Sequence, residues 1–175
     1  SALGLINPET TTTAQVEGVK PLGGLMIEAV WPEGLNADVD LWAQAPGDIP
    51  VGYSNKGGAF LNLLRDDLGR LMDVTPINME TVVSRGLPGG KYVVNVHLYR
   101  NDSAKTEVPV RVVISRNRST DGNKQILMTD VKIPLEGVEV TAFRFDLTDE
   151  GDLVPGSVDS LNTPLRSFLK PDGGP

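Results

Sequence analysis

The chain has 175 residues, a formal net charge of −7 and no cysteine. Its length fits one domain, and the absence of cysteine excludes disulfide scaffolds, thiolate zinc sites and cysteine nucleophiles. The acidic balance disfavours binding to nucleic acid, and no apolar run approaches the roughly 18 residues of a membrane span. His97 is the only histidine, which also excludes a histidine-rich metal site.

The first 24 residues form an extended N-terminal arm in this interpretation, rather than part of a core. Residues 8–15 are polar and β-branched without a packing period, and residues 21–24 are a Pro/Gly cluster that interrupts regular structure. Two alternatives remain open for the arm. It is either a linker or a segment whose apolar residues dock on a neighbouring subunit, namely Leu3, Leu5 and Ile6.

Residues 25–158 are predicted to form an all-β domain. Apolar residues alternate with polar ones at a period of two, which is typical of strands with one face on a core. Turn signals separate the runs at short intervals, so we expect about eight to ten antiparallel strands in a sandwich. Pro109 indicates an edge or a bulge. The clearest strands are 25–31, 38–45, 92–99, 108–114 and 141–147, with others near 50–54, 59–64, 79–84 and 125–135.

The densest polar cluster combines Asp38 and Asp40 with Asp66 and Asp67. Residues two apart in a strand share a face, so the first two carboxylates point the same way. Oxygen-rich clusters of this kind suit Ca²⁺, which takes six to eight oxygen ligands. The alternative is structural: the aspartates cap turns and accept backbone hydrogen bonds. A paired-carboxylate hydrolase is the least favoured interpretation, because nothing in the sequence indicates a cleft.

Three other side chains, those of His97, Trp31 and Trp42, are candidates for a functional role. His97 lies on the outward register of its strand, and without a Gly-x-Ser-x-Gly elbow we interpret it as a half-exposed histidine hydrogen-bonded on a sheet face. Trp31 shares its register with core residues. Trp42 lies on the face of Asp38 and Asp40, which predicts either a contact surface or a second packed layer.

The C-terminal tail, residues 159–175, is predicted to carry a short helix. Thr163 would be its N-cap and Pro164 its first helical position. The helix would either cap the sandwich or dock on a partner. Its apolar face would comprise Leu161, Leu165, Phe168 and Leu169.

Several of these motifs occur in an order that resembles bacterial and phage β-sandwich domains of unassigned function. They are Asp38-Val39-Asp40-Leu41-Trp42, Arg65-Asp66-Asp67-Leu68-Gly69, and the strand from Pro88-Gly89-Gly90 to His97. More distantly, the chain is similar to the C-terminal pre-peptidase sandwich of secreted peptidases. The resemblance covers about residues 25–100.

The resemblance implies a jelly-roll-like sandwich used as an accessory, non-catalytic module. It also implies that a calcium ion, where relatives hold one, would map onto Asp38 and Asp40. We therefore expect a non-enzymatic structural and interaction module of a larger assembly, with protein subunits as partners and an oligomeric state. A phage virion or other extracellular assembly is the favoured location. The alternative is a calcium-dependent module of the periplasm or cell envelope that binds a glycan or a protein.

Overall fold

The structure is a computed structural model that describes residues 23–65, 77–118 and 122–169. These residues form an all-β fold, as the alternating pattern predicted, with eight strands and one turn of 3₁₀-helix. The strands are β1 (Gly24–Val30), β2 (Ala37–Gln44), β3 (Leu61–Arg65), β4 (Met79–Ser84), β5 (Gly90–Asn101), β6 (Val108–Arg118), β7 (Gly122–Ile133) and β8 (Glu139–Leu147).

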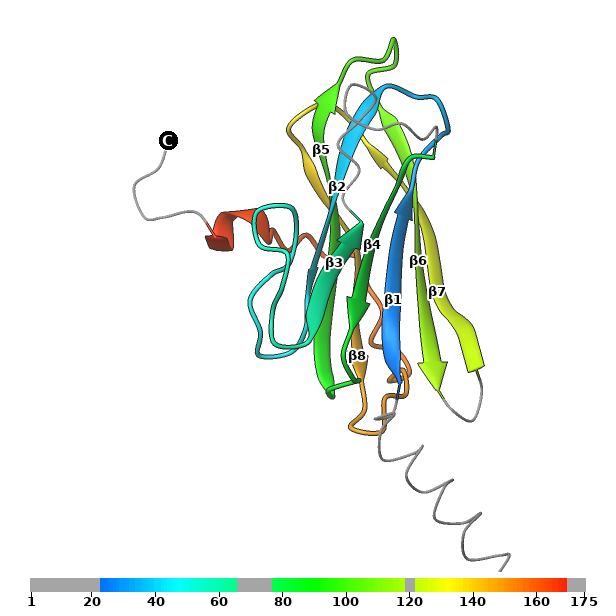
Figure 1. Cartoon of the computed structure of the whole chain (residues 1–175), viewed down its shortest axis with the longest axis vertical. Helices are drawn as coiled ribbons and strands as arrows, with labels where there is room; N and C mark the ends of the chain where they lie inside the picture. The colour runs from blue at the N-terminus through cyan, green and yellow to red at the C-terminus, as the bar shows by residue number, and fades with distance from the viewer. Residues whose placement is uncertain (1–22, 66–76, 119–121, 170–175) are drawn as a thin grey trace, which may run out of the picture.

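Two antiparallel sheets make up the sandwich (Figure 1). The larger sheet has the strand order β3-β4-β1-β6-β7, and the smaller one has the order β2-β5-β8. The expected strand near residues 50–54 is absent as a separate element. That segment makes only isolated bridges, such as the one between Val51 and Ala43, because it folds back along the edge of β2.

The core lies between the sheets and follows the alternation in the sequence. Leu25, Ile27 and Ala29 of β1 belong to the core. Trp31, directly after β1, belongs to it too, so the assignment of Trp31 to the core is confirmed. The smaller sheet contributes alternate residues of β2, β5 and β8 to the same cluster. Burial of these apolar surfaces contributes roughly 25 cal/mol per Å², which makes the inner faces the main source of stability.

Three of the four sheet edges are covered by backbone from the same chain. On β2, the amide of Ala43 donates to the carbonyl of Val51 at 3.0 Å. On β3, the amide of Leu63 donates to the carbonyl of Lys56 at 2.8 Å. On β8, isolated bridges join the strand to the segment that follows it. Covering an edge in this way prevents unwanted strand pairing.

Pro109 lies in β6, which is an interior strand of the larger sheet. The pairing of β1 with β6 ends at Val30 and Arg111, so at Pro109 the strand has a neighbour on its β7 side only. Proline lacks an N–H group and is tolerated where no ladder bond is required. The edge that Pro109 predicted is therefore a local one, beyond the end of β1.

The prediction of a short α-helix in the C-terminal tail is wrong. The described part of the tail contains a single 3₁₀ turn, Arg166–Leu169, and no α-helix. Upstream, the tail is extended because Asp159 exchanges two backbone hydrogen bonds with Arg144 of β8. The tail's pairing with β8 leaves too few residues before Pro171 for a longer helix.

The predicted arm, apart from residues 23 and 24, lies outside the described residues. No helix in the described ranges is long and apolar enough to cross a membrane.

Candidate functional site

The outer face of the smaller sheet brings together most of the candidate side chains. Asp38, Asp40 and Trp42 project from β2, and Asp40 pairs in register with His97 of β5. Trp42 pairs in register with Asn95 of the same strand. Glu139 of β8 lies opposite His97 on its other side, so the histidine is flanked by carboxylates on both neighbouring strands.

His97 and Asp40 form a buried pair. The Nδ1 atom of the imidazole lies 2.8 Å from Oδ2 of the aspartate. The expected hydrogen bond on a sheet face is therefore confirmed, but the expected half-exposure is wrong, since His97 is only 2% exposed. The contact joins two strands across a low-dielectric layer, where such bonds are stronger than in water.

Trp42 lies in a second packed layer. It is 1% exposed and clusters with Val93 and with Leu165 of the tail. Gly52 lies directly against the indole ring, because a Cβ atom at that position would fall 2.3 Å from the ring. Neither Trp42 nor Leu165 is thus available to a partner in this structure. Of the alternatives left open by the sequence, the structure has the second layer for Trp42 and the intramolecular cap for Leu165.

Two tyrosines lie beside this layer and reach solvent. Tyr53 packs edge-on against Trp42, with ring centroids 5.7 Å apart, and contacts Tyr99 at 5.8 Å. Tyr99 also lies 6.4 Å from the ring of His97. The two tyrosines are 37% and 52% exposed, respectively. They were missed by sequence reasoning, although Tyr99 has the same outward register as His97.

Glu139 connects the smaller sheet to the tail. Its Oε2 atom accepts hydrogen bonds from Asn95 Nδ2 at 2.6 Å and from the amide of Leu165 at 2.8 Å. The same asparagine donates to the carbonyl of Thr163, whose amide donates to Thr141 Oγ1. The carboxylate thus satisfies backbone donors at the start of the 3₁₀ turn, which is the capping role predicted for Thr163.

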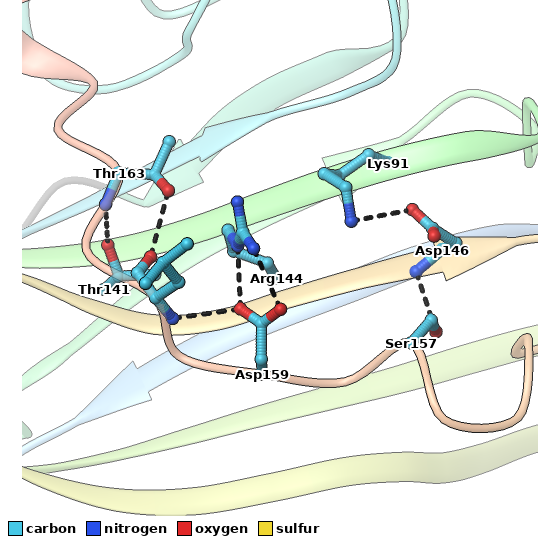
Figure 2. A network of polar contacts seen from close by, with 8 residues as sticks. Lys91, Thr141, Arg144, Asp146, Ser157, Asp159 and Thr163 are labelled. Carbon is cyan, nitrogen blue, oxygen red and sulfur yellow. Dashed lines mark hydrogen bonds and ion pairs between the residues drawn. The ribbon is translucent and has the colours of Figure 1, made fainter.

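A second polar network holds the tail further along β8 (Figure 2). Arg144 makes a two-pronged contact with the carboxylate of Asp159, at 2.7 and 2.9 Å. This hydrogen-bonded guanidinium, together with the amide of Leu161, lowers the pKa of Asp159 well below its usual range. Asp146 adds an ion pair with Lys91 at 3.1 Å, and its amide donates to the Ser157 hydroxyl, as Figure 2 shows.

Glu80 links the two sheets and was not singled out from the sequence. It is fully buried in β4, and its Oε2 atom accepts a hydrogen bond from the amide of Leu41 in β2 at 2.6 Å. The signal was available, because Glu80 shares the inward register of Val82 in a predicted strand. A carboxylate at such a position must find buried donors.

Asp48 organises the loop that covers Trp42. Its carboxylate accepts the amides of Ile49 at 2.8 Å and Phe60 at 3.1 Å. Burial acts to raise the pKa of Asp48, but the backbone donors of Phe60, Ala59 and Ile49 and the charge of Arg85 together lower it. The loop is therefore fixed by an ionised aspartate.

The predicted calcium ligands are only partly placed. Asp38 and Asp40 are buried on one face, but Asp66 and Asp67 lie outside the described residues. Within the described ranges, no group of three or more histidine, aspartate or glutamate side chains could hold a metal ion. The described residues alone do not fit calcium, since Asp40 is already bonded to His97 and the ion needs about six oxygens. The four-residue set stays a prediction.

The other predicted contact residues are Leu3, Leu5, Ile6, Phe168 and Leu169. Leu3, Leu5 and Ile6 belong to the part of the arm beyond the described residues, and the side chains of Phe168 and Leu169 are not described. Comparison of the chain with protein-family models, with curated proteins and with solved structures gives no match. These comparisons therefore add no support to the family resemblance noted in the sequence.

Proposed function

We propose that this chain is a non-enzymatic structural and interaction module that works within a larger protein assembly. The observation that carries the proposal is that several of its polar side chains form hydrogen bonds that hold the fold together. Asp40, His97, Glu80 and Glu139 are engaged in contacts between strands, between sheets or with the tail. Such contacts fix a rigid scaffold, and a rigid scaffold suits a subunit that presents surfaces to neighbours.

A difference between the outer faces of the two sheets also supports the proposal. The chain covers the outer face of its smaller sheet with its own loop and tail, whereas the larger sheet exposes Val30, Leu64 and Met128 on its outer side. These three apolar side chains are accessible for contact with a neighbouring molecule. A phage particle is the assembly that the sequence resemblance favours.

The direct test is the mass in solution of the full chain, measured by light scattering across a concentration range. We expect an oligomer that a variant lacking residues 1–20 no longer forms. The tail is kept in this variant, because Leu165 packs on Trp42. An unchanged oligomeric state and unchanged partner binding after the deletion would contradict the proposal.

The calcium-dependent envelope module is tested separately by thermal melting. A ligand that binds only the folded state raises the melting temperature, and the rise grows with the logarithm of the ligand concentration above the dissociation constant. If calcium binds, the rise in melting temperature disappears in an Asp38→Asn, Asp40→Asn variant. If calcium gives the parent protein no rise, the alternative is excluded at useful affinity.

A further inference from the structure

Tyr53 and Tyr99 form an exposed pair of rings beside the layer that covers Trp42. The ring centroids are 5.8 Å apart and the ring planes are inclined by 62°, so the two phenols meet edge to face. Both side chains also reach solvent, since they are 37% and 52% exposed. The fold therefore brings two phenols from distant parts of the chain into contact at a surface that small oxidants can reach.

A β-bulge leaves the ring of Tyr99 without a cross-strand neighbour on β2. The pairing of β2 with β5 shifts at this point, because Asp38 lies opposite Arg100 whereas Val39 lies opposite Leu98. Tyr99 is thus the extra residue of the bulge. Bulges bend a strand and re-aim its side chains. Because no β2 side chain lies opposite it, the ring of Tyr99 is left to pack on Tyr53.

A tight turn fixes the backbone on both sides of Tyr53. Gly52 and Asn55 exchange two backbone hydrogen bonds, at 2.9 and 3.0 Å, and enclose Tyr53 between them. Gly52 lies against the indole of Trp42, which leaves the turn no room to move inward. The ring of Tyr53 is held edge-on to that indole at 5.7 Å and to Tyr99 on its other side.

The third tyrosine of the chain is enclosed in the core. Tyr92 is 1% exposed, its ring stacks on Phe145, and its hydroxyl donates to the carbonyl of Pro88 at 2.7 Å. In the described ranges, neither the hydroxyl of Tyr53 nor that of Tyr99 makes a hydrogen bond. Packing of these two rings alone would need only phenylalanine, so the exposed phenols are chemical groups that the fold itself does not use.

We infer that Tyr53 and Tyr99 are a site of oxidative cross-linking, at which a peroxide-driven one-electron oxidant joins the two rings of one chain as a dityrosine. Each phenol loses one electron and its hydroxyl proton, which leaves two phenoxyl radicals. A carbon–carbon bond forms between the ring carbons next to the two oxygens. The hydrogen on each of these carbons then returns to its oxygen as a proton, which restores both phenols.

The oxidant is hydrogen peroxide, activated by a haem peroxidase. One molecule of peroxide accepts the two electrons and two protons that the tyrosines lose, and it becomes two molecules of water. The cross-linked chain is therefore lighter by two hydrogen atoms and carries no added group. The reaction needs only a single chain, so it goes beyond the proposed function and does not depend on it.

The contact between the rings favours coupling within the chain. Two reactive groups that a protein holds together behave as if each were present at a very high concentration, so they react with each other before they meet another chain. The product would tie the turn that carries Tyr53 to β5 and so hold the cover of Trp42 in place. The chain has no cysteine, so it has no disulfide to do this.

Treatment of the full chain with hydrogen peroxide and a haem peroxidase tests the inference. We expect dityrosine fluorescence from a product that stays monomeric on a denaturing gel and has lost two hydrogen atoms by mass spectrometry. Sequencing of the joined peptides should place the bond between Tyr53 and Tyr99. The yield for each chain should not change on dilution, because the two rings belong to one molecule.

Phenylalanine substitutions show whether the two phenols are required. Tyr53→Phe and Tyr99→Phe keep the packed rings but remove the hydroxyl from which the radical forms, so each should abolish the intrachain product. Tyr92→Phe is the matched control and should leave the yield unchanged, since Tyr92 is buried away from the pair. Persistence of the intrachain product in Tyr53→Phe or in Tyr99→Phe would overturn the assignment.

Thermal melting of the cross-linked chain gives an independent readout. The bond between Tyr53 and Tyr99 closes a long loop in the unfolded chain, so the melting temperature should rise by roughly 10 °C. An unchanged melting temperature would show that the bond does not hold the turn to β5. The inference is also overturned if the oxidised chain forms only cross-linked dimers, if the bond involves Tyr92, or if no dityrosine forms.

Discussion

The outer faces of the two sheets differ in what covers them. The smaller sheet is covered by the loop around Gly52 and by the tail, so Trp42 and His97 are almost fully buried there. The larger sheet keeps an open groove of about 560 Å³ at the end of β1, lined by Val30, Pro109 and Arg111 among others. The difference shows that the chain covers one side of its sandwich with its own loop and tail, whereas the described residues leave the other side uncovered.

The largest expected effect concerns the covered face. Trp42→Ala should cost about 3–5 kcal/mol of unfolding free energy, because it leaves a cavity between Gly52, Val93 and Leu165. Met128→Ala, on the uncovered side, should change the free energy by less than about 0.5 kcal/mol in the isolated chain. Urea denaturation measures both. Similar losses for the two variants would remove the contrast between the faces.

The tail provides a smaller and more local test. Leu165→Ala should cost about 2–4 kcal/mol, because the side chain is 2% exposed and packs on Trp42. Leu161→Ala is the matched control, since Leu161 is 63% exposed and should lose almost nothing. If the two variants are equally stable by thermal melting, the tail does not seal the face.

The buried pair should have an intermediate effect. His97→Leu leaves the carboxylate of Asp40 without its imidazole partner, which should cost about 2 kcal/mol of unfolding free energy. Tyr99→Leu, two residues further along β5 and half exposed, is the control. Equilibrium unfolding of both variants decides the point, and a neutral His97→Leu would show that the pair does not hold β2 to β5.

The smallest effect is a dependence on pH. Arg144 lowers the pKa of Asp159, so the folded state favours the ionised carboxylate. The resulting stability is present above the unfolded pKa of about 3.9 and is lost as the pH falls towards the folded value. Asp159→Asn should therefore melt below the parent protein at pH 6, with a difference that shrinks below about pH 4. A constant difference across this range would contradict the account.

The sequence predicted the strands well because each one packs a single face on the core. In β1, the period of two from Leu25 to Trp31 reports the inner face of the larger sheet directly. The Asp38, Asp40 and Trp42 face of β2 was also predicted correctly as a shared face. These features depend on residues that are close together in the chain.

The covering of that face could not be predicted in the same way. Leu165 meets Trp42, and Glu80 reaches Leu41, only after distant segments have folded together. The predicted helix failed for the same reason, since the amides near its start are bound by Glu139 and Thr141 of β8. Local capping signals at Thr163 and Pro164 do not report such tertiary partners.

Amide hydrogen exchange along β7 tests the central claim most directly, that this open side of the molecule meets other subunits. β7 ends its sheet and pairs only with β6 among the described strands, whereas the amide of Leu41 is bound by Glu80 within the chain. We predict that three β7 amides, those of Met128, Asp130 and Lys132, become protected in the full chain as its concentration rises and stay unprotected in the variant lacking residues 1–20. The Leu41 amide should be equally protected in both. Fast exchange of the three β7 amides at every concentration would contradict the account.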